Sequence, residues 1–280
     1  MLRVNERRLE FREGLRVADL VSDCKPEADL FIVNGYPVAG DTPLHDGDVC
    51  CLIRRGEVPA AEEMQYLLVA RHTPGVHEQM KRATVGIMGL GGLGSPVAVA
   101  LARIGVGRLI LADFDVVEPS NLNRKQYFVE QIGLRKTVAL KENITRINPY
   151  VRVELVDDRL TEENIPLYFK EADVLAECFD DPVMKACALR AFRMRMAALG
   201  YVGASGMAGY GDNNTIATRE IFPQVFLVGD GMSESGPGQG LMAPRVGIVA
   251  HHQANQIVRI ILAANDLDRA DMGKNNENYL

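Results

Sequence analysis

The chain has 280 residues, of which 47% are hydrophobic and 24% charged, and its formal net charge is −6 at pH 7. This length allows one large domain, or a domain of about 200 residues together with a small one. The acidic balance argues against a nucleic-acid partner, because such partners call for a basic face. Apolar runs of about 18 residues are missing, and the charged N-terminus is unlike a signal peptide. We therefore expect a cytoplasmic protein with no membrane and no nucleic-acid partner.

Five cysteines are scattered along the sequence, and none of them forms a CxxC motif with another. An odd number without an export signal argues against a disulfide framework, and the missing CxxC excludes a four-cysteine zinc site. The five histidines add no metal-ligand spacing. The sequence therefore predicts no zinc.

The first 57 residues show the pattern of a small α+β domain. Alternating apolar residues predict a hairpin over residues 2–11, and apolar residues at helical spacing predict a helix over residues 16–24. Two further strands are expected at residues 30–33 and 49–53. Strand, strand, helix, strand, strand is the order of a β-grasp, or ubiquitin-like, domain.

Two short segments strengthen the β-grasp interpretation. Val33-Asn34-Gly35 and Leu44-His45-Asp46-Gly47-Asp48 resemble the V-N-G and L-x-D-G-D segments of ThiS-type sulfur carrier proteins. A working carrier of that type ends in a free Gly-Gly, whereas this chain continues through Arg54-Arg55-Gly56-Glu57. The resemblance thus implies a carrier-like domain that is not itself a substrate. Two roles stay open for it, namely a docking or stabilising module and a small packing domain with no separate role.

The strongest local signal in the rest of the chain lies at residues 84–95. An apolar run leads into Gly89, Gly91 and Gly94, and a helix-forming run follows, which predicts a strand, a glycine turn and a helix. This spacing matches GxGxxG, in which the glycines allow a tight turn and a close approach of the backbone to phosphate. Ser95 is expected to cap the helix, whose first amides would face an anion. An ordinary tight turn remains the alternative.

A second strand is predicted to end in Asp113, 19 residues beyond Gly94. A carboxylate at this place binds ribose in dinucleotide-binding units. A nicotinamide-dependent oxidoreductase would show the same pattern, but it would leave the next polar residues, Asn121, Arg124 and Lys136, without a role. Fixed cations suit an enzyme that splits a triphosphate, because negative charge develops on the phosphates during the reaction.

Together these segments resemble a known family. The combination of GxGGLG, DxDxVexSNLxR and GxxK is similar to the ThiF/MoeB family of carrier-protein adenylyltransferases, which are related to ubiquitin-activating enzymes. The resemblance covers residues 64–262, and residues 71–75 with the carrier-like domain indicate the ThiF branch, which lacks zinc. It implies an α/β fold, in which a Rossmann-like ATP-binding domain with a mainly parallel sheet follows the β-grasp domain.

The resemblance implies roles for individual residues. It implies a nucleotide-binding set of Gly89, Gly91, Gly92, Gly94, Asp113, Asp115, Asn121, Arg124 and Lys136. Within this set, Asp113 would bind ribose, and Arg124 and Lys136 would act as catalytic cations on opposite sides of the triphosphate. Two plainer alternatives stay open, namely a surface salt bridge for Arg124 and a solvated helix end for Lys136. The family has Gln directly after the arginine, whereas this chain has Lys125.

A buried strand is predicted to run out into Asp180-Asp181, at the sheet edge where open α/β folds bind ligands. Family members carry Asp-Asn there, so the resemblance implies that Asp180 is catalytic and organises Mg²⁺ on the ATP. One carboxylate with phosphate oxygens and water suits Mg²⁺. The alternative, that Asp180 caps the following helix, can hold at the same time.

The second domain is expected to span residues 83–265, after a linker and entry helix over residues 58–82 and before a polar tail over residues 266–280. A glycine-dense stretch at residues 228–240 predicts a loop. This loop would close over an adenylate, guide a partner's extended tail, or form a plain surface loop. A helix over residues 248–263 is expected to pack on the sheet.

The resemblance implies that the C-terminal glycine carboxylate of a separate ThiS-like carrier attacks the α-phosphate of ATP and releases pyrophosphate. Thiamine thiazole synthesis is the expected use, with molybdopterin synthesis or another sulfur-transfer pathway as alternatives. Because no cysteine follows Cys187, the adenylate is expected to pass to an external sulfur donor. Family members often act as homodimers completed by a partner's arginine, for which Arg71 is the candidate. An NAD-dependent oxidoreductase and a non-enzymatic carrier-docking scaffold remain the other classes.

Overall fold

The computed structural model describes residues 1–69, 75–196 and 200–276 of the chain. The chain divides into two units, Met1–His77 and Glu78–Leu280, which are described separately. Among the described residues, no helix is both long and apolar enough to cross a bilayer. Arg71, the arginine expected to complete a partner's site, lies outside the described residues.

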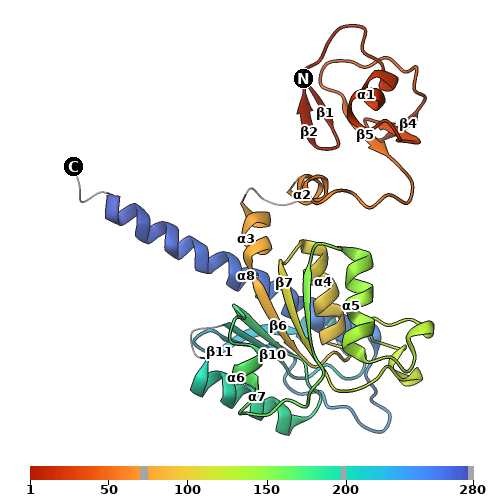
Figure 1. The fold of residues 1–280 in the computed structure, drawn as a ribbon. Helices are drawn as coiled ribbons and strands as arrows, with labels where there is room; N and C mark the ends of the chain where they lie inside the picture. The colour runs from red at the N-terminus through yellow and green to blue at the C-terminus, as the bar shows by residue number, and fades with distance from the viewer. Residues whose placement is uncertain (70–74, 197–199, 277–280) are drawn as a thin grey trace. The chain divides into compact units, whose positions relative to one another are not determined.

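The N-terminal unit is built on a five-stranded sheet with helix α1 against it (Figure 1). Its elements are β1 (Leu2–Val4), β2 (Arg7–Leu9), α1 (Val17–Cys24), β3 (Leu30–Val33), β4 (Tyr36–Val38) and β5 (Val49–Ile53), followed by α2 (Ala61–Val69). The strand order is β2-β1-β5-β3-β4, in which β1 pairs in parallel with β5 and the hairpins β1-β2 and β3-β4 are antiparallel. This is a β-grasp arrangement as the sequence predicts, with β4 as a strand in addition to the predicted ones.

Both hairpins of this unit turn at an asparagine. Asn5 and Asn34 have positive φ angles of 44° and 50°, a left-handed conformation that asparagine tolerates better than most residues. Asn5 also accepts a hydrogen bond from the Leu52 amide at 2.8 Å, which ties the first turn to β5. Val17 and Leu20 of α1 are buried in one core with apolar residues of β1 and β5, and this core holds the helix to the sheet.

The second unit holds a seven-stranded sheet of order β11-β12-β10-β9-β6-β7-β8 (Figure 1). Its strands are β6 (Thr84–Met88), β7 (Arg108–Ala112), β8 (Arg152–Val156), β9 (Val174–Glu177), β10 (Gly200–Ala204), β11 (Ala217–Phe222) and β12 (Val225–Gly229). Within the described part of the chain, the antiparallel pairing of this sheet is that of β11 with β12, and the other pairings are parallel. The carboxyl ends of the parallel strands therefore share one edge, as in a Rossmann-like sheet. The predicted α/β class is confirmed.

Helices cover both faces of this sheet. They are α4 (Gly94–Ile104), α5 (Lys136–Ile147), α6 (Ile165–Tyr168), α7 (Pro182–Arg195) and α8 (Ala243–Asn276). Helix α3 (Val76–Arg82) directly precedes β6 in the chain, and the short 3-10 turns are η1 (Pro119–Asn121), η2 (Val129–Gln131) and η3 (Asn213–Thr215). Helices α4, α5 and α8 lie on one face, and α6 and α7 lie on the other (Figure 1). On the latter face, Phe169 and Phe192 are buried against β7 and β9.

Helix α8 is longer than its sequence pattern predicts, because it begins at Ala243 and ends at Asn276 rather than spanning residues 248–263. Most of the segment expected as a polar tail is therefore helical. Most of its residues are polar, but no proline or glycine interrupts them before Gly273, and helices tolerate polar side chains where such breakers are missing. The stretch expected as a linker and entry helix contains the two helices α2 and α3.

Candidate functional site

The glycine turn joins β6 to α4 at the carboxyl edge of the sheet. Gly89 has a φ of 87°, a conformation that favours glycine. A Cβ added to Gly94 would stand 1.9 Å from the Gly89 carbonyl oxygen, so no larger residue fits there. A Cβ on Gly91, by contrast, would meet no atom within 4 Å. The turn is therefore closed at Gly94 and open at Gly91, as a phosphate-binding turn requires.

Ser95 does not cap helix α4, contrary to the prediction from the sequence. The helix begins at Gly94, and its N-cap residue, Leu93, makes no side-chain cap bond with any described residue. Ser95 lies inside the first turn, where its hydroxyl donates to the Gly91 carbonyl at 2.7 Å and accepts from the Gln126 amide at 3.0 Å. Within α4 the Ser95 amide donates to the Gly91 carbonyl and the Val97 amide to the Leu93 carbonyl, both at 3.1 Å. Among the described residues, no hydrogen bond engages the amides of residues 91–94, so these are the amides left for an anion.

Asp113 lies directly after β7 and joins three segments of the site. Its carboxylate accepts hydrogen bonds from the amides of Leu90 at 2.7 Å and Asp115 at 2.9 Å. Lys136, the first residue of α5, places its ammonium 3.3 Å from Asp113 and 2.6 Å from Asp115. The Lys136 side chain is 6% exposed, so the alternative of a solvated lysine at a helix end is wrong.

Arg124 follows the turn η1 and lies against the glycine turn. A Cβ on Gly92 would come within 3.3 Å of the Arg124 side chain and 3.2 Å of Val246 in the first turn of α8. The Arg124 guanidinium donates to Asn123 at 2.8 Å. Among the described residues no carboxylate pairs with this guanidinium, which removes a surface salt bridge as its role. Asn121 is buried within η1.

Asp180 follows β9 and is exposed, and within the described residues no hydrogen bond or ion pair holds its side chain. Asp180 does not cap the following helix, α7, which was its alternative role. The cap is Asp181, whose carboxylate accepts a hydrogen bond from the Val183 amide at 2.8 Å. The Cys178 carbonyl lies against Gly89, so the segment that carries Asp180 passes beside the glycine turn. The Asp180 carboxylate is thus free to meet a ligand bound at that turn.

A buried acid–base pair that the sequence pattern does not predict supports this edge of the sheet. Glu177 is 2% exposed, accepts from the Phe179 amide at 2.8 Å and lies 2.9 Å from the Lys185 ammonium. Burial raises the pKa of Glu177, and Lys185 opposes this rise. Gln253 of α8 donates to the Glu177 carbonyl at 2.9 Å and ties α8 to the same strand end. The sequence signal for this cluster is a glutamate inside an apolar strand.

A second buried pair, also missed from the sequence, fixes the loops around the start of α8. Arg245 is 5% exposed, lies 2.8 Å from Asp230 and donates to the carbonyl oxygens of Gly211 and Asp212. Burial opposes ionisation of Asp230, but hydrogen bonds from the Ser233 amide and other donors prevail and hold the pKa of Asp230 well below its usual range. The glycine-dense stretch expected as a loop is thus tied down at Asp230.

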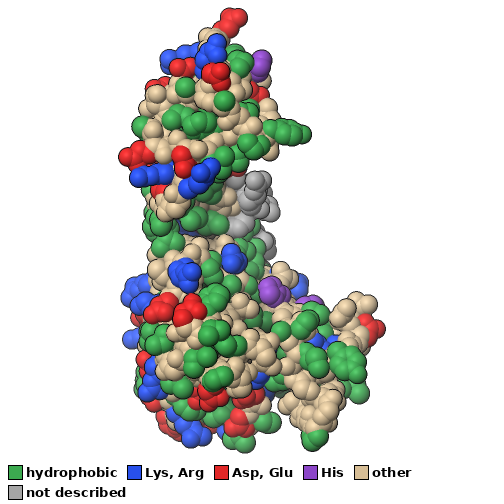
Figure 2. Space-filling view, turned by 90° about the vertical axis from the view of Figure 1, so that its right-hand side faces the viewer, with side chains coloured by type: hydrophobic (Ala, Val, Ile, Leu, Met, Phe, Trp, Pro, Cys, Tyr) green, Lys and Arg blue, Asp and Glu red, His purple; other side chains and the backbone are tan. Residues whose placement is uncertain are grey.

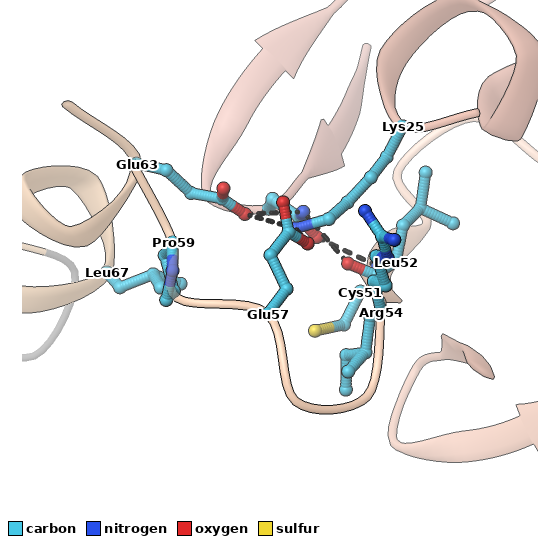
Figure 3. Close-up of a pocket in the computed structure, with 10 residues that line it drawn as sticks. Lys25, Cys51, Leu52, Arg54, Glu57, Pro59, Glu63 and Leu67 are labelled. Atoms are coloured by element: carbon cyan, nitrogen blue, oxygen red, sulfur yellow. Dashed lines mark hydrogen bonds and ion pairs between the residues drawn. The ribbon is translucent and has the colours of Figure 1, made fainter. Parts of the chain in front are cut away.

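A separate hollow lies in the N-terminal unit, where the chain leaves β5 (Figure 3). It is lined by Asn5, Lys25, Cys51, Leu52, Ile53, Arg54, Glu57, Pro59, Glu63 and Leu67. The Lys25 ammonium lies 2.9 Å from Glu57 and 3.1 Å from Glu63 (Figure 3). This internal ion pair holds the segment after β5 onto its own domain.

Two family models match the chain. The ThiF family model matches residues 64–279, and the ThiS-like ubiquitin model matches residues 1–56. The chain belongs to the ThiF family. Both matches confirm the resemblances drawn from the sequence, and the glycine turn, Asp113, Arg124, Lys136 and Asp180 all lie within the ThiF family match.

Curated relatives of this ThiF-family chain carry adenylyltransferase names. The chain is 31% identical to the adenylyltransferase and sulfurtransferase UBA4 of Kluyveromyces lactis over 184 residues, which are 65% of this chain and 38% of that protein. It is 30% identical to the UBA4 of Eremothecium gossypii over 239 residues, or 80% of this chain and 52% of that protein. The sulfur carrier protein adenylyltransferase of Thermus thermophilus is 38% identical over 109 residues, or 39% of this chain and 40% of that protein. The ThiF-family chain thus spans between 38% and 52% of the length of these relatives.

Solved structures share the fold of this ThiF-family chain. E. coli tRNA N6-threonylcarbamoyladenosine dehydratase, TcdA, in complex with AMP has a TM-score of 0.65 at 22% identity, covering 71% of this chain and 94% of that one. E. coli MccB with ATP has a TM-score of 0.53 at 24% identity, covering 66% of this chain and 57% of that one. At these identities the likeness concerns the fold alone.

Proposed function

We propose that this ThiF-family chain is an adenylyltransferase, which uses ATP to activate the C-terminal glycine carboxylate of a small sulfur carrier protein and releases pyrophosphate. The observation that carries the proposal is the Lys136 ammonium, buried between Asp113 and Asp115 beside an open glycine turn. A fixed cation next to the unengaged amides of residues 91–94 suits a triphosphate. The names of the relatives from Eremothecium gossypii and Thermus thermophilus support the same chemistry.

The residues around the turn fit ATP. The open space at Gly91 allows phosphate oxygens to approach the backbone, and Arg124 lies beside it without an acidic partner among the described residues. Asp113 would bind the ribose, while Asn121 would hold the phosphates together with Arg124 and Lys136. Two structures with the same fold, TcdA and MccB, were solved with AMP and ATP, which supports an adenine nucleotide here as well.

The donors present fit a magnesium ion held mainly by ATP. Among the described residues, no group of three or more His, Cys, Asp or Glu side chains is placed to enclose a metal ion. Asp180 offers one exposed carboxylate on a segment beside the glycine turn, and Mg²⁺ is commonly held by one or two carboxylates with phosphate oxygens and water. When bound, the ion would neutralise charge on the triphosphate.

The reaction needs no general base, because the carrier's carboxylate is already ionised at neutral pH. One carboxylate oxygen forms a bond to the α-phosphorus, the bond from that phosphorus to the bridging oxygen of the β-phosphate breaks, and pyrophosphate leaves with the electron pair. Arg124 and Lys136 would offset the charge that develops on the phosphates. Correct positioning of the two reactants supplies much of the remaining acceleration. The adenylate then passes to an external sulfur donor.

The carrier in this proposal is a separate protein. The chain's own β-grasp domain continues into Glu57, which Lys25 holds at 2.9 Å, so the domain offers no free carboxylate at this place. A ThiS-like domain favours a carrier for thiamine thiazole synthesis, and the sulfurtransferase names of relatives fit other sulfur-transfer pathways as well. A homodimer in which Arg71 of the partner subunit completes the site is part of the proposal.

The alternatives are less well supported. A tRNA substrate, which the name of TcdA suggests, calls for a basic face, whereas Figure 2 shows acidic and basic side chains mixed over the visible face of a chain with net charge −6. An oxidoreductase would leave Arg124 and Lys136 without a role. A docking scaffold without activity would need no open glycine turn.

Exchange of labelled pyrophosphate into ATP tests the proposal. With Mg²⁺ and a carrier that ends in Gly-Gly, label should enter ATP, and the same carrier without its last glycine should give none. No exchange with any Gly-Gly carrier would favour the docking scaffold. A rise in melting temperature with NAD but not with ATP would favour the oxidoreductase.

A further inference from the structure

Lys125 follows Arg124 in the turn after η1, and none of the roles above uses it. We propose that its ammonium is a third cation of the phosphate site, left without an acidic partner until the triphosphate of a bound nucleotide supplies one. This inference rests on the proposed nucleotide chemistry and adds a binding residue to it. The family has Gln at this position, so the lysine adds a charge to the site.

Hydrogen bonds on both sides hold Lys125 next to the glycine turn. Its amide donates to the last residue of η1 at 3.0 Å. The following residue, Gln126, donates its amide to the Ser95 hydroxyl at 3.0 Å. The hydroxyl of buried Tyr127 donates to the Leu90 carbonyl inside the glycine turn at 2.8 Å. The backbone of Lys125 therefore cannot leave the turn without breaking the contacts of its neighbours.

The charged groups that act on Lys125 come from three segments. Arg124 precedes it, Lys136 lies on α5, and Asp113 and Asp115 follow β7. The two acids already hold Lys136 at 3.3 and 2.6 Å. Among the described residues, no hydrogen bond or ion pair engages the Lys125 ammonium. A half-buried cation beside two others is unfavourable until an anion joins them.

The titration of Lys125 agrees with this geometry. Partial burial, reinforced by Lys136 and Arg124, lowers the pKa of Lys125 to about 8, against the attraction of Asp113 and Asp115. A triphosphate reverses this balance, because its negative charge favours the protonated amine. Nucleotide binding near pH 8 should therefore be accompanied by proton uptake, about half a proton per site where the pH equals the pKa.

Isothermal titration calorimetry of ATP with Mg²⁺ at pH 8, repeated in buffers of high and low ionisation enthalpy, measures this uptake. Wild type should take up about half a proton more than Lys125→Gln, because the variant lacks the titrating amine. The protons that ATP itself binds or releases are the same in both titrations and cancel when the two values are subtracted. At pH 7 Lys125→Gln should bind ATP about 5- to 10-fold more weakly. The matched control, Lys141→Gln, removes an exposed lysine charge on α5 and should behave as wild type.

Melting temperatures without nucleotide give a second readout. Because the pKa of Lys125 lies below that of an exposed lysine, its charge opposes folding below about pH 8 and ceases to do so as the pH rises toward about 10. Lys125→Gln should therefore melt about 2–4 °C higher than wild type at pH 7. The gap should be smaller at pH 9, a dependence that a merely structural role would not produce.

The outcomes separate this inference from the proposed function. Loss of proton uptake and weaker ATP binding confined to Lys125→Gln would support it. If wild type binds ATP, but Lys125→Gln and Lys141→Gln show equal proton uptake and equal affinity, the role of Lys125 is overturned and the proposed function stands. A wild-type protein that binds no ATP would overturn both.

Discussion

The Lys136 ammonium lies 2.6 Å from the Asp115 carboxylate, at the first residue of α5. Lys136 also approaches Asp113, which is 8% exposed, whereas the Asp115 side chain is 51% exposed. The lysine is thus anchored on its buried side and paired with a solvated acid on the other. A bound triphosphate would compete with Asp115 for the Lys136 ammonium. Because water already screens the pair of Lys136 with Asp115, replacing Asp115 by a phosphate costs little free energy.

We expect Lys136→Met to lower the rate of ATP–pyrophosphate exchange about 100-fold or more, because it removes a fixed group that stabilises developing charge. Its melting temperature should also fall, because Asp113 loses its buried cation. Asp115→Asn is the matched control, since it removes the exposed member of the ion pair and should change the free energy of unfolding by less than about 1 kcal/mol. Equal loss of stability in the two variants would contradict this division of roles.

Gly91 and Gly94 separate nucleotide binding from folding. Gly91→Ala places a methyl group where no protein atom lies within 4 Å, so its free energy of unfolding should stay within about 0.5 kcal/mol of wild type. Stabilisation by ATP and exchange should nevertheless drop, because the methyl group occupies the space of a phosphate. Gly94→Ala would meet the Gly89 carbonyl oxygen at 1.9 Å and should destabilise the fold by about 3 kcal/mol. Thermal melts with and without ATP measure both effects, and full exchange by Gly91→Ala would show that the nucleotide does not approach there.

Features set by local chemistry are predictable from this sequence. The glycine turn follows from the spacing of its glycines, and Asp113 follows from the apolar run of β7. Lys136 stands at the start of α5, where the helical pattern of the sequence begins. The turn at Asn5 likewise lies within the hairpin predicted over residues 2–11. In each case the decisive residues lie within one or two elements of each other.

Features that depend on the folded chain are not predictable in this way. Arg245 meets Asp230 because two loops fold back on the start of α8, and Lys25 meets Glu57 and Glu63 because the chain returns past α1 after β5. No spacing rule connects such residues. From the sequence alone, each of these charged residues would be expected on the surface, exposed to solvent.

The prediction of helix caps fails for a different reason, since a shift of one or two residues changes the role of a side chain. The extended backbone at Asp181 makes it the N-cap of α7, which leaves the neighbouring Asp180 unengaged within the described residues. Ser95 lies two residues after Leu93, the N-cap of α4, and donates to the Gly91 carbonyl of the glycine turn instead. Sequence patterns place helix ends to within a few residues, which is too coarse to distinguish these positions.

Asp180→Ala and Asp181→Ala form a matched pair that exploits this shift. Asp180→Ala should lower exchange about 100-fold without lowering the melting temperature, because no described residue binds its side chain. Asp181→Ala should lose about 1 kcal/mol of stability with its cap on the Val183 amide, while it retains exchange. If Asp180 acts through Mg²⁺, raising the Mg²⁺ concentration should restore part of the lost rate. Retained exchange in Asp180→Ala would remove it from the site.

Arg245→Met should destabilise the second unit by about 3 kcal/mol, because it leaves the Asp230 carboxylate partly buried without its cation. The pKa of Asp230 is depressed in the folded protein, so its contribution to stability is present above about pH 4 and is lost as the pH falls further. Calorimetric melts between pH 3 and pH 7 should therefore show a steeper acid decline for wild type than for the double variant Asp230→Asn/Arg245→Met. Parallel curves for the two proteins would mean that the pair contributes nothing to this acid dependence.

Lys25 is the residue that keeps the end of the β-grasp domain in place. Its side chain is 14% exposed and shared by Glu57 and Glu63. Lys25→Met leaves both carboxylates without this cation and should cost about 1–2 kcal/mol of stability in the N-terminal unit. The segment after β5 should then open more often, and trypsin should cleave faster after Arg54 and Arg55, both of which are exposed.

A matched control for this variant is Arg3→Met, which removes an exposed arginine lying 3.4 Å from Glu6 in the first hairpin and should be cleaved at the wild-type rate. Equal cleavage of the two variants would contradict a tie through Lys25.

The same pair of variants distinguishes the two roles left open for the β-grasp domain, because a domain that only packs can loosen without effect on catalysis. A rise in the carrier concentration needed for half-maximal exchange, in Lys25→Met alone and with an unchanged ATP requirement, would favour docking of the carrier on this domain.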